Sequence, residues 1–222
     1  MSCKKDNAEP GGGGNTGGDG RFSVSSTTTV EFAPGNLWYD GSAFRFEENQ
    51  WSFASTWNPS HVSHFKWSDA ANAVTGDYSY SGDLFCNNNF TVAGDSHTWR
   101  TLSGAEWDYL LYTRDNASSL RAWVTLSDVS VSGLVLLPDG STATASGITT
   151  SSALADAGAV FLPAAGYRIG TDVDYVGSFG FYWSSTPNEY DEDYAYFMYF
   201  LSGDASSGNY TRDFGYSVRL VW

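Results

Sequence analysis

The sequence FYWSSTP at residues 181–187 and the sequence GYSVRLVW at residues 215–222 bound the segment with the clearest pattern in this chain. Both ends are rich in aromatic and β-branched residues, which favour strands. Between them, residues 188–216 consist largely of Tyr, Asp, Ser, Gly and Asn. Tyrosine supplies a large, rigid contact area with two torsions to fix, and Ser, Gly and Asn supply adaptable polar contacts. The composition therefore predicts a binding surface that the rest of the chain holds in place.

The overall composition limits the classes of partner. The chain has 222 residues, which suits one sizeable domain, and its aromatic content of 17% predicts a compact, turn-rich fold with a largely aromatic core. The formal net charge is −14. We expect no nucleic-acid partner, because nucleic-acid binding needs clustered Lys and Arg. No apolar run approaches the roughly 18 residues that span a bilayer, so we expect membrane association only through a lipid anchor.

The N-terminal segment predicts such an anchor. Residues 1–26 are expected to be a flexible tether, because the glycine runs at 11–14 and 17–20 cannot bury enough apolar surface to fold. The sequence SCKKD at residues 2–6 resembles the remnant of a bacterial lipoprotein signal, in which a small residue precedes a cysteine that becomes lipidated. On this interpretation Cys3 carries a lipid at the bacterial cell surface, as in an outer-membrane lipoprotein. The alternative is an accidental cysteine near a natural start.

The folded domain is expected at residues 27–222, with an α+β order of scattered strands and about two helices. Strands are predicted at residues 30–32, 134–137 and 159–163, and a hairpin at residues 37–46 around an Asp-Gly turn. Residues 51–94 predict ordered loops with a short helix at 68–74. The sequence SGAE at residues 103–106 is a capping-box pattern that begins a helix, and residues 151–157 predict a second, shorter one. Cys86 is expected to be an inert thiol in a buried strand.

Several motifs carry a resemblance to a known family. They are WRTLSGAEW at 99–107, GLVLLPD at 133–139, AGAVFLPAAGYR at 157–168, YWSST at 182–186 and GYSVR at 215–219. In their order along the chain and in their residues they resemble the C-type-lectin-fold domains of the formylglycine-generating-enzyme subtype. Many gut-type bacteria display such domains as surface lipoproteins. A subset of that group are the variable proteins of diversity-generating retroelements. The resemblance covers roughly residues 27–222 and implies a C-type-lectin-like fold with small antiparallel sheets, about two helices and long ordered loops.

The resemblance also implies a ligand-binding face. In diversified members the C-terminal segment lies across the exposed face of a small sheet, and adenine-rich codons there are rewritten. The candidate ligand-binding residues carried over are Tyr190, Asp191, Asp193, Tyr194, Phe197, Tyr199, Leu201, Asp204, Ser206, Asn209, Tyr210, Asp213 and Phe214. The interleaved residues Tyr196, Met198, Phe200, Arg212, Gly215, Val218 and Arg219 are expected to be framework.

Strand geometry supports that division independently. Side chains alternate faces along a strand, so Met198 and Phe200 share a core side with Tyr196, while residues 197, 199 and 201 share the other side. The alternative is a central strand that is buried on both faces. An Asn codon changed only at its adenines yields Tyr, Asp, Ser, Phe or Leu but not Glu or Met. Glu189, Glu192 and Met198 should therefore be invariant.

Catalytic and metal chemistry is not expected. Formylglycine-generating enzymes use a cysteine pair, whereas the expected domain holds only Cys86, so that chemistry does not carry over. The histidines and nearby carboxylate with weak metal-site spacing are His61, His64, Asp95 and His97. The acidic cluster at residues 189–193 lacks the regular oxygen spacing of a calcium loop and predicts a solvated rim. Ca²⁺ at that cluster, or at Asp172 and Asp174, is the weaker alternative.

The sequence thus predicts a monomeric surface protein, not an enzyme, that recognises an unknown protein or glycan without a cofactor. It is expected to be a diversity-generating-retroelement variable protein. The alternatives are a carbohydrate-binding, lectin-type module and an adhesin subunit of fixed specificity.

Overall fold

The computed structural model describes residues 20–78, 85 and 90–222. The first 19 residues of the tether expected at 1–26, the predicted lipidation site Cys3 and the predicted core thiol Cys86 lie outside these residues. The described strands are β1 (Phe22–Ser23), β2 (Thr29–Val30), β3 (Leu37–Tyr39), β4 (Phe44–Phe46), β5 (Arg100–Thr101), β6 (Arg121–Leu126), β7 (Val131–Leu136), β8 (Val160–Pro163), β9 (Tyr167–Ile169), β10 (Asp172–Asp174), β11 (Phe179–Pro187), β12 (Tyr194–Leu201), β13 (Asp204–Thr211) and β14 (Leu220–Val221). The described helices are α1 (Gly104–Asp108), which continues as the π-helical η2 (Tyr109–Thr113), the 3₁₀ turn η3 (Ala145–Gly147) and α2 (Ser151–Asp156).

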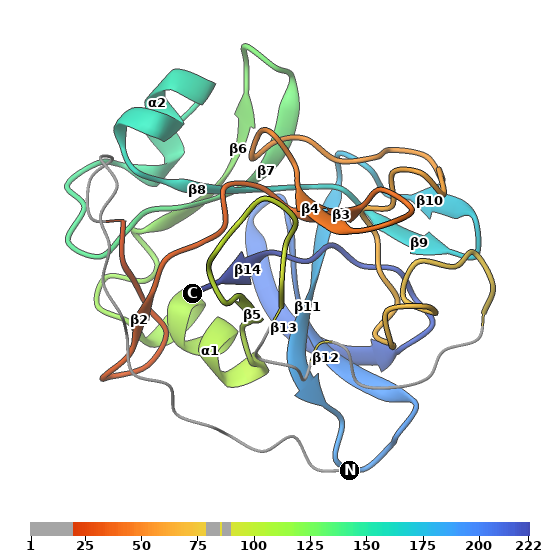
Figure 1. The fold of residues 1–222 in the computed structure, drawn as a ribbon. Coiled ribbons are helices and arrows are strands. Elements are labelled where there is room, and N and C mark those ends of the chain that lie inside the picture. Colours follow the sequence, from red (N-terminus) through yellow and green to blue (C-terminus); the bar gives the residue numbers. More distant parts are fainter. Residues whose placement is uncertain (1–19, 79–84, 86–89) are drawn as a thin grey trace.

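The strands form small antiparallel sheets. Two sheets have three strands, in the orders β6-β7-β8 and β11-β12-β13, and four others have two strands each. Figure 1 shows these sheets joined by long loops, with α2 at the upper left and α1 at the lower left, beside the β11–β13 layer. The small antiparallel sheets and two helices are therefore confirmed, although the fold is mostly β rather than an even mixture of strands and helices. None of the described helices is long and apolar enough to cross a membrane.

The helix α1 begins as the sequence predicts. The Ser103 side chain accepts a hydrogen bond from the Glu106 N–H, and the Glu106 carboxylate accepts one from the Ser103 N–H at 2.8 Å, which completes the capping box. Trp107, Leu110 and Leu111 follow on one side and are buried in the core cluster that also contains β12 residues. The helix thus anchors one face of the β11–β13 sheet.

The predicted hairpin at residues 37–46 is also confirmed. β3 pairs with β4 in antiparallel register, and the Asp40 carboxylate accepts hydrogen bonds from the N–H groups of Ser42 and Ala43 at the turn. The predicted strands 134–137 and 159–163 lie in or beside β7 and β8, which pair with each other.

The short helix predicted at residues 68–74 is wrong, because this segment is a series of turns. The Asp69 side chain accepts hydrogen bonds from the N–H groups of Ala71 and Asn72, both at 2.9 Å. This is the bonding of a helix N-cap, and the Ala73 N–H also donates to the Asp69 carbonyl at 2.8 Å. The segment thus makes a single helix-like turn that does not continue as a helix.

The expected boundary at residue 27 is too late. Phe22 and Val24 are buried, and β1 pairs with β2. The Ser23 N–H donates to the Asp139 carboxylate at 2.7 Å, which ties this strand to the loop after β7. Two buried apolar side chains give these residues the driving force to fold that the preceding glycine runs lack.

The C-terminal residues close the fold against segments from the N-terminal third. β14 pairs with β5, and the Trp222 and Leu220 carbonyls accept hydrogen bonds from Glu31 and Ala33. The buried Arg219 donates to Ala33 O at 2.9 Å, as well as to carbonyls and an amide oxygen elsewhere in the core. Residues separated by most of the chain therefore share one backbone network.

Candidate functional site: an aromatic face on the β11–β13 sheet

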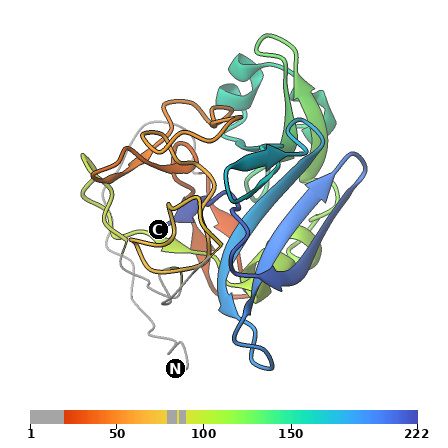
Figure 2. The ribbon, with the colours of Figure 1, turned by 90° about the vertical axis from the view of Figure 1, so that its right-hand side faces the viewer.

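One face of the β11–β13 sheet is lined with aromatic side chains. Directly paired residues in an antiparallel ladder lie on the same face, and the register pairs Phe181 with Tyr199 and Tyr199 with Ser206. The opposite face carries Tyr182, Met198 and Phe200, which are buried against α1. Figure 2 shows the three strands as a twisted layer along one side of the molecule. The observed register therefore places Met198 and Phe200 on the core side, as strand alternation predicts.

We call the open part of this surface, together with the neighbouring β9–β10 hairpin, the aromatic face. It consists of Tyr167, Tyr175, Phe179, Phe181, Tyr199, Leu201, Tyr210 and Phe214.

Phe181 is the centre of the aromatic face. Its ring stacks on Phe179 at a centroid distance of 5.7 Å and on Tyr199 at 6.2 Å, and it meets Tyr167 edge-on at 5.5 Å. Aromatic pairs in these geometries stabilise one another beyond their buried area. The rings therefore hold each other in place before any ligand arrives.

A second set of contacts extends the face toward β10 and the end of β13. Tyr167 stacks on Tyr175 at 5.5 Å and contacts Phe214 at 5.4 Å, and Phe214 meets the Tyr210 ring at 4.7 Å. Tyr175 and Tyr210 are 56% and 45% exposed, while the other rings are half-buried. A contiguous apolar patch with exposed edges is the usual sign of an interaction surface.

The pKa values of Tyr167, on this face, and of Tyr216, beneath it, are raised by burial. Burial raises the pKa of Tyr167, with further contributions from Tyr175, Asp174 and Tyr210. Burial also raises the pKa of Tyr216, which lies under the face, and the charge of Asp213 adds to that effect. Neutral phenols keep an O–H donor for a ligand.

Asp213 adds an unsatisfied acceptor at the edge of the face. Its Oδ1 atom is buried and has no hydrogen-bond donor among the residues that the structure describes. A buried carboxylate oxygen without a donor is unusual, because the lost hydration is not replaced. Asp213 precedes Phe214, so this oxygen belongs to the same region as the Tyr210–Phe214 ring pair.

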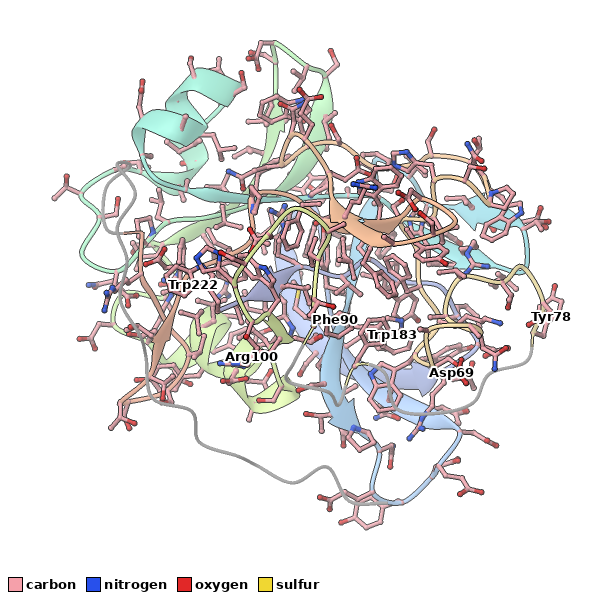
Figure 3. All side chains as sticks on the ribbon, in the orientation of Figure 1. Asp69, Tyr78, Phe90, Arg100, Trp183 and Trp222 are labelled. Carbon is pink, nitrogen blue, oxygen red and sulfur yellow. The ribbon has the colours of Figure 1, made fainter. Side chains whose placement is uncertain are left out.

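Phe197 was predicted to contact ligand, and that placement is wrong. Its side chain is only 8% exposed and packs against Tyr216 at 4.9 Å and Trp183 at 6.1 Å. Figure 3 shows Trp183 in the interior of the molecule. On the paired strand, Gly208 leaves the room that the Phe197 ring occupies, since a Cβ at Gly208 would lie 3.2 Å from its Cζ atom. β12 is therefore buried on both faces at this end.

The predicted ligand-binding residues do not form one patch. Tyr199, Leu201, Asp204 and Ser206 lie together near the turn between β12 and β13. Tyr210, Asp213 and Phe214 lie at or just after the end of β13, which is the end of the sheet next to the β11–β12 turn. The remaining candidates at that end are Tyr190, Asp191, Asp193, Tyr194 and Asn209, and the Tyr194 ring meets the Tyr210 ring at 6.2 Å. The two turns lie at opposite ends of the eight-residue strand β12, roughly 25 Å apart.

The β11–β12 turn is held by local bonds. The Asn188 side-chain oxygen accepts hydrogen bonds from the N–H groups of Tyr190 and Asp191, and the Asn188 amide donates to Asn209 at 3.1 Å. Tyr190 is 94% exposed and separate from the aromatic face. This turn therefore stands apart as a polar, acidic projection.

Sequence reasoning missed four residues of the aromatic face: Tyr167, Tyr175, Phe179 and Phe181. A signal for two of them was present, because Phe179 and Phe181 alternate in the sequence FGFYW at residues 179–183. Finding the other two required knowing that the β9–β10 hairpin packs beside the sheet.

The weak metal-site residues have other roles. The buried His64 donates to Ala165 O at 2.9 Å, His61 bonds the Glu47 carboxylate at 2.7 Å, and His97 bonds Asp95 at 2.9 Å. Within the described part of the chain, no group of three or more His, Cys, Asp or Glu side chains is placed to hold a metal ion.

Comparison with known proteins adds a family of unknown function. A protein-family profile described as "Domain of unknown function (DUF8237)" matches residues 139–221. This stretch contains all of β8 to β14, and hence the whole aromatic face. No curated protein matches the chain, and no solved structure matches it.

Proposed function

We propose that this chain is a ligand-binding surface protein whose aromatic face contacts a macromolecular ligand. The observation that carries the proposal is the contiguous ring network from Tyr175 through Phe181 to Tyr199, half exposed on a sheet whose other face is anchored by α1. Association is costly when side chains must be ordered at the interface. Rings that already pack on one another lower that cost, and aromatic residues dominate the affinity of many interfaces.

We further propose that the fold is C-type-lectin-like and that the chain is a retroelement-diversified variable protein. In support, the long loops, small antiparallel sheets and two short helices have the character that the resemblance implies. Tyr199, Leu201, Asp204, Ser206 and Tyr210 are exposed or half-buried and belong to the residue types that adenine changes in an Asn codon can produce. Met198, which such changes cannot produce, is buried on the core side. A reverse-transcriptase gene beside a near-copy of this coding segment, differing only at adenines, would test this part.

Display outside the cell on a lipid anchor at Cys3 completes the proposal. It is supported by the SCKKD sequence and by the glycine-rich segment that follows it. Labelling of the native protein with a radioactive fatty acid, compared with a Cys3→Ser variant, tests it directly.

The decisive experiment on function is panning of the immobilised full chain with a phage-displayed random-peptide library. The selected pool is then assayed on Tyr199→Ala and on Tyr190→Ala, a matched variant at the exposed β11–β12 turn. We expect Tyr199→Ala to lose nearly all binding and Tyr190→Ala to keep it. Loss with Tyr190→Ala alone would show that the turn is the contact surface and would refute the aromatic face.

A carbohydrate ligand is the second candidate, and one observation favours it. The neutral Tyr167 hydroxyl and the exposed carboxylates Asp174 and Asp204 lie beside flat rings, which is the combination that stacks on a sugar and bonds its hydroxyls. A glycan array with and without Ca²⁺ separates this candidate from peptide recognition.

A further inference from the structure

The surface charge in the C-terminal part of the chain is one-sided. Residues 139–222 contain three arginines and no lysine, and all three arginine side chains are buried. The acidic residues of the same stretch are Asp139, Asp156, Asp172, Asp174, Glu189, Asp191, Glu192, Asp193, Asp204 and Asp213. None of these ten side chains is buried. The surface around the aromatic face therefore presents carboxylates without competing cations from this stretch.

The buried arginines are engaged inside the fold. Arg168 donates to the carbonyls of His64, Thr75 and Gly170. Its burial lowers its pKa to about 10, so it remains charged at neutral pH. Arg212 lies over the Trp67 ring at 4.3 Å and donates to the Tyr194 carbonyl at 3.1 Å. These guanidinium groups are thus held away from the surface where a ligand would bind.

Carboxylates surround the aromatic face itself. Asp174 is paired with Tyr167 in the β9–β10 hairpin, and Asp204 is paired with Leu201 across β12 and β13. Both are exposed. Asp213 is half-buried, precedes Phe214 and interacts electrostatically with Tyr216 beneath the face. Three separate elements therefore bring a negative charge to the edge of one patch of rings.

A positively charged side chain can interact favourably with both the aromatic rings and the carboxylates of this surface. Ring faces attract a guanidinium or ammonium group by the cation–π interaction, and carboxylates form short, strong hydrogen bonds with it. Charge complementarity also directs the encounter and rejects acidic partners. We propose that the aromatic face selects a protein segment that presents Arg or Lys side chains. This inference rests on the proposed function and specifies its ligand.

The test uses an oligo-arginine peptide and its neutral oligo-citrulline counterpart, measured by fluorescence anisotropy on the full chain. We expect the arginine peptide to bind and the citrulline peptide to bind at least about tenfold more weakly, because citrulline keeps the shape but loses the charge. Asp213→Asn should weaken arginine binding about tenfold, and Tyr199→Ala should weaken it at least as much.

The matched control is Asp156→Asn, which removes one exposed charge on α2, away from the aromatic face. It should leave affinity nearly unchanged. Equal losses with Asp156→Asn and Asp213→Asn would show nonspecific attraction and overturn the inference, as would equal binding of the citrulline peptide. If the peptides selected by panning are neutral or acidic yet depend on Tyr199, the proposed function stands and the cationic ligand is wrong. If they do not depend on Tyr199, both proposals fail.

Discussion

His64 shows how much a single side chain depends on its surroundings. Sequence spacing suggested it only as a weak metal ligand, whereas the structure encloses its ring in the core, next to the charged Arg168. Burial lowers its pKa to about 4, and the Arg168 charge lowers it further while the bond to Ala165 opposes the change. His64 is therefore neutral at physiological pH.

This burial predicts a pH dependence of folding. The ordinary pKa of 6.5 applies to the unfolded chain, so between pH 6.5 and about 4 the unfolded chain binds a proton that the folded chain does not. The stability that His64 contributes is complete above pH 6.5 and falls as the pH drops toward 4. Between about pH 7.5 and pH 5 the loss should be about 2 kcal/mol.

Urea unfolding of the wild type and of His64→Gln at both pH values measures this contribution. Glutamine keeps a donor for the Ala165 carbonyl but does not titrate, so its stability should fall by about 2 kcal/mol less than that of the wild type. Parallel losses in the two proteins would assign the pH dependence to the carboxylates instead.

At the scale of one element, β12 differs between its two ends. Near the β11–β12 turn, Phe197 is buried between Trp183 and Tyr216, and near the β12–β13 turn, Tyr199 and Leu201 are half-buried. The same side of this strand thus serves the core at Phe197 and the aromatic face at Tyr199 and Leu201.

Two alanine variants on the same side of β12 should therefore behave differently. Phe197→Ala should lower the free energy of unfolding by about 3–5 kcal/mol, because it leaves a cavity in the core. Tyr199→Ala should lower it by about 1 kcal/mol, because its ring is partly solvated and loses mainly its contacts with neighbouring rings. Urea unfolding at neutral pH compares them, and similar losses would show that Tyr199 is a core residue.

Local sequence signals predicted the helices and strands, but not how deeply their side chains are buried. The capping box at Ser103 and the Asp-Gly hairpin act within a few residues, and both are observed. The burial of Phe197 depends on Trp183 and Tyr216, which reach it only through the register of β11 and the return of the C-terminal segment. Such long-range pairings leave no local pattern in a single sequence.

The charge of the whole molecule should make its stability depend on salt. A net charge of −14 repels itself in the compact state. Raising NaCl from about 20 mM to about 300 mM screens this repulsion. We expect a gain of about 1 kcal/mol, or roughly 2–4 °C in the unfolding midpoint.

Differential scanning calorimetry at the two salt concentrations provides the measurement. A fall in the midpoint would mean that ion pairs such as Arg114–Asp139 and Arg100–Glu106 outweigh the general repulsion. KCl serves as the control for effects specific to sodium.

At this scale the sequence predicted a single aromatic-rich domain with small sheets and two helices, but it placed the start of that domain too late. Phe22 and Val24 follow directly on glycine-rich sequence, and only their partners in β2 and near Asp139 make them part of the core. The position of the β9–β10 hairpin beside the β11–β13 sheet could likewise not be predicted from the sequence, because it depends on packing between distant segments.

The pairing of residues 218–222 with residues 31–37 has a consequence for biosynthesis. A ribosome makes the first partner early and the second only after some 180 further residues. Until Trp222 has left the exit tunnel, residues 31–37 lack their hydrogen-bond partners at residues 218–222, and Arg219 cannot donate to the Ala33 carbonyl. The pairing of residues 31–37 should therefore form late in synthesis, whereas locally paired sheets such as β6–β8 can form earlier.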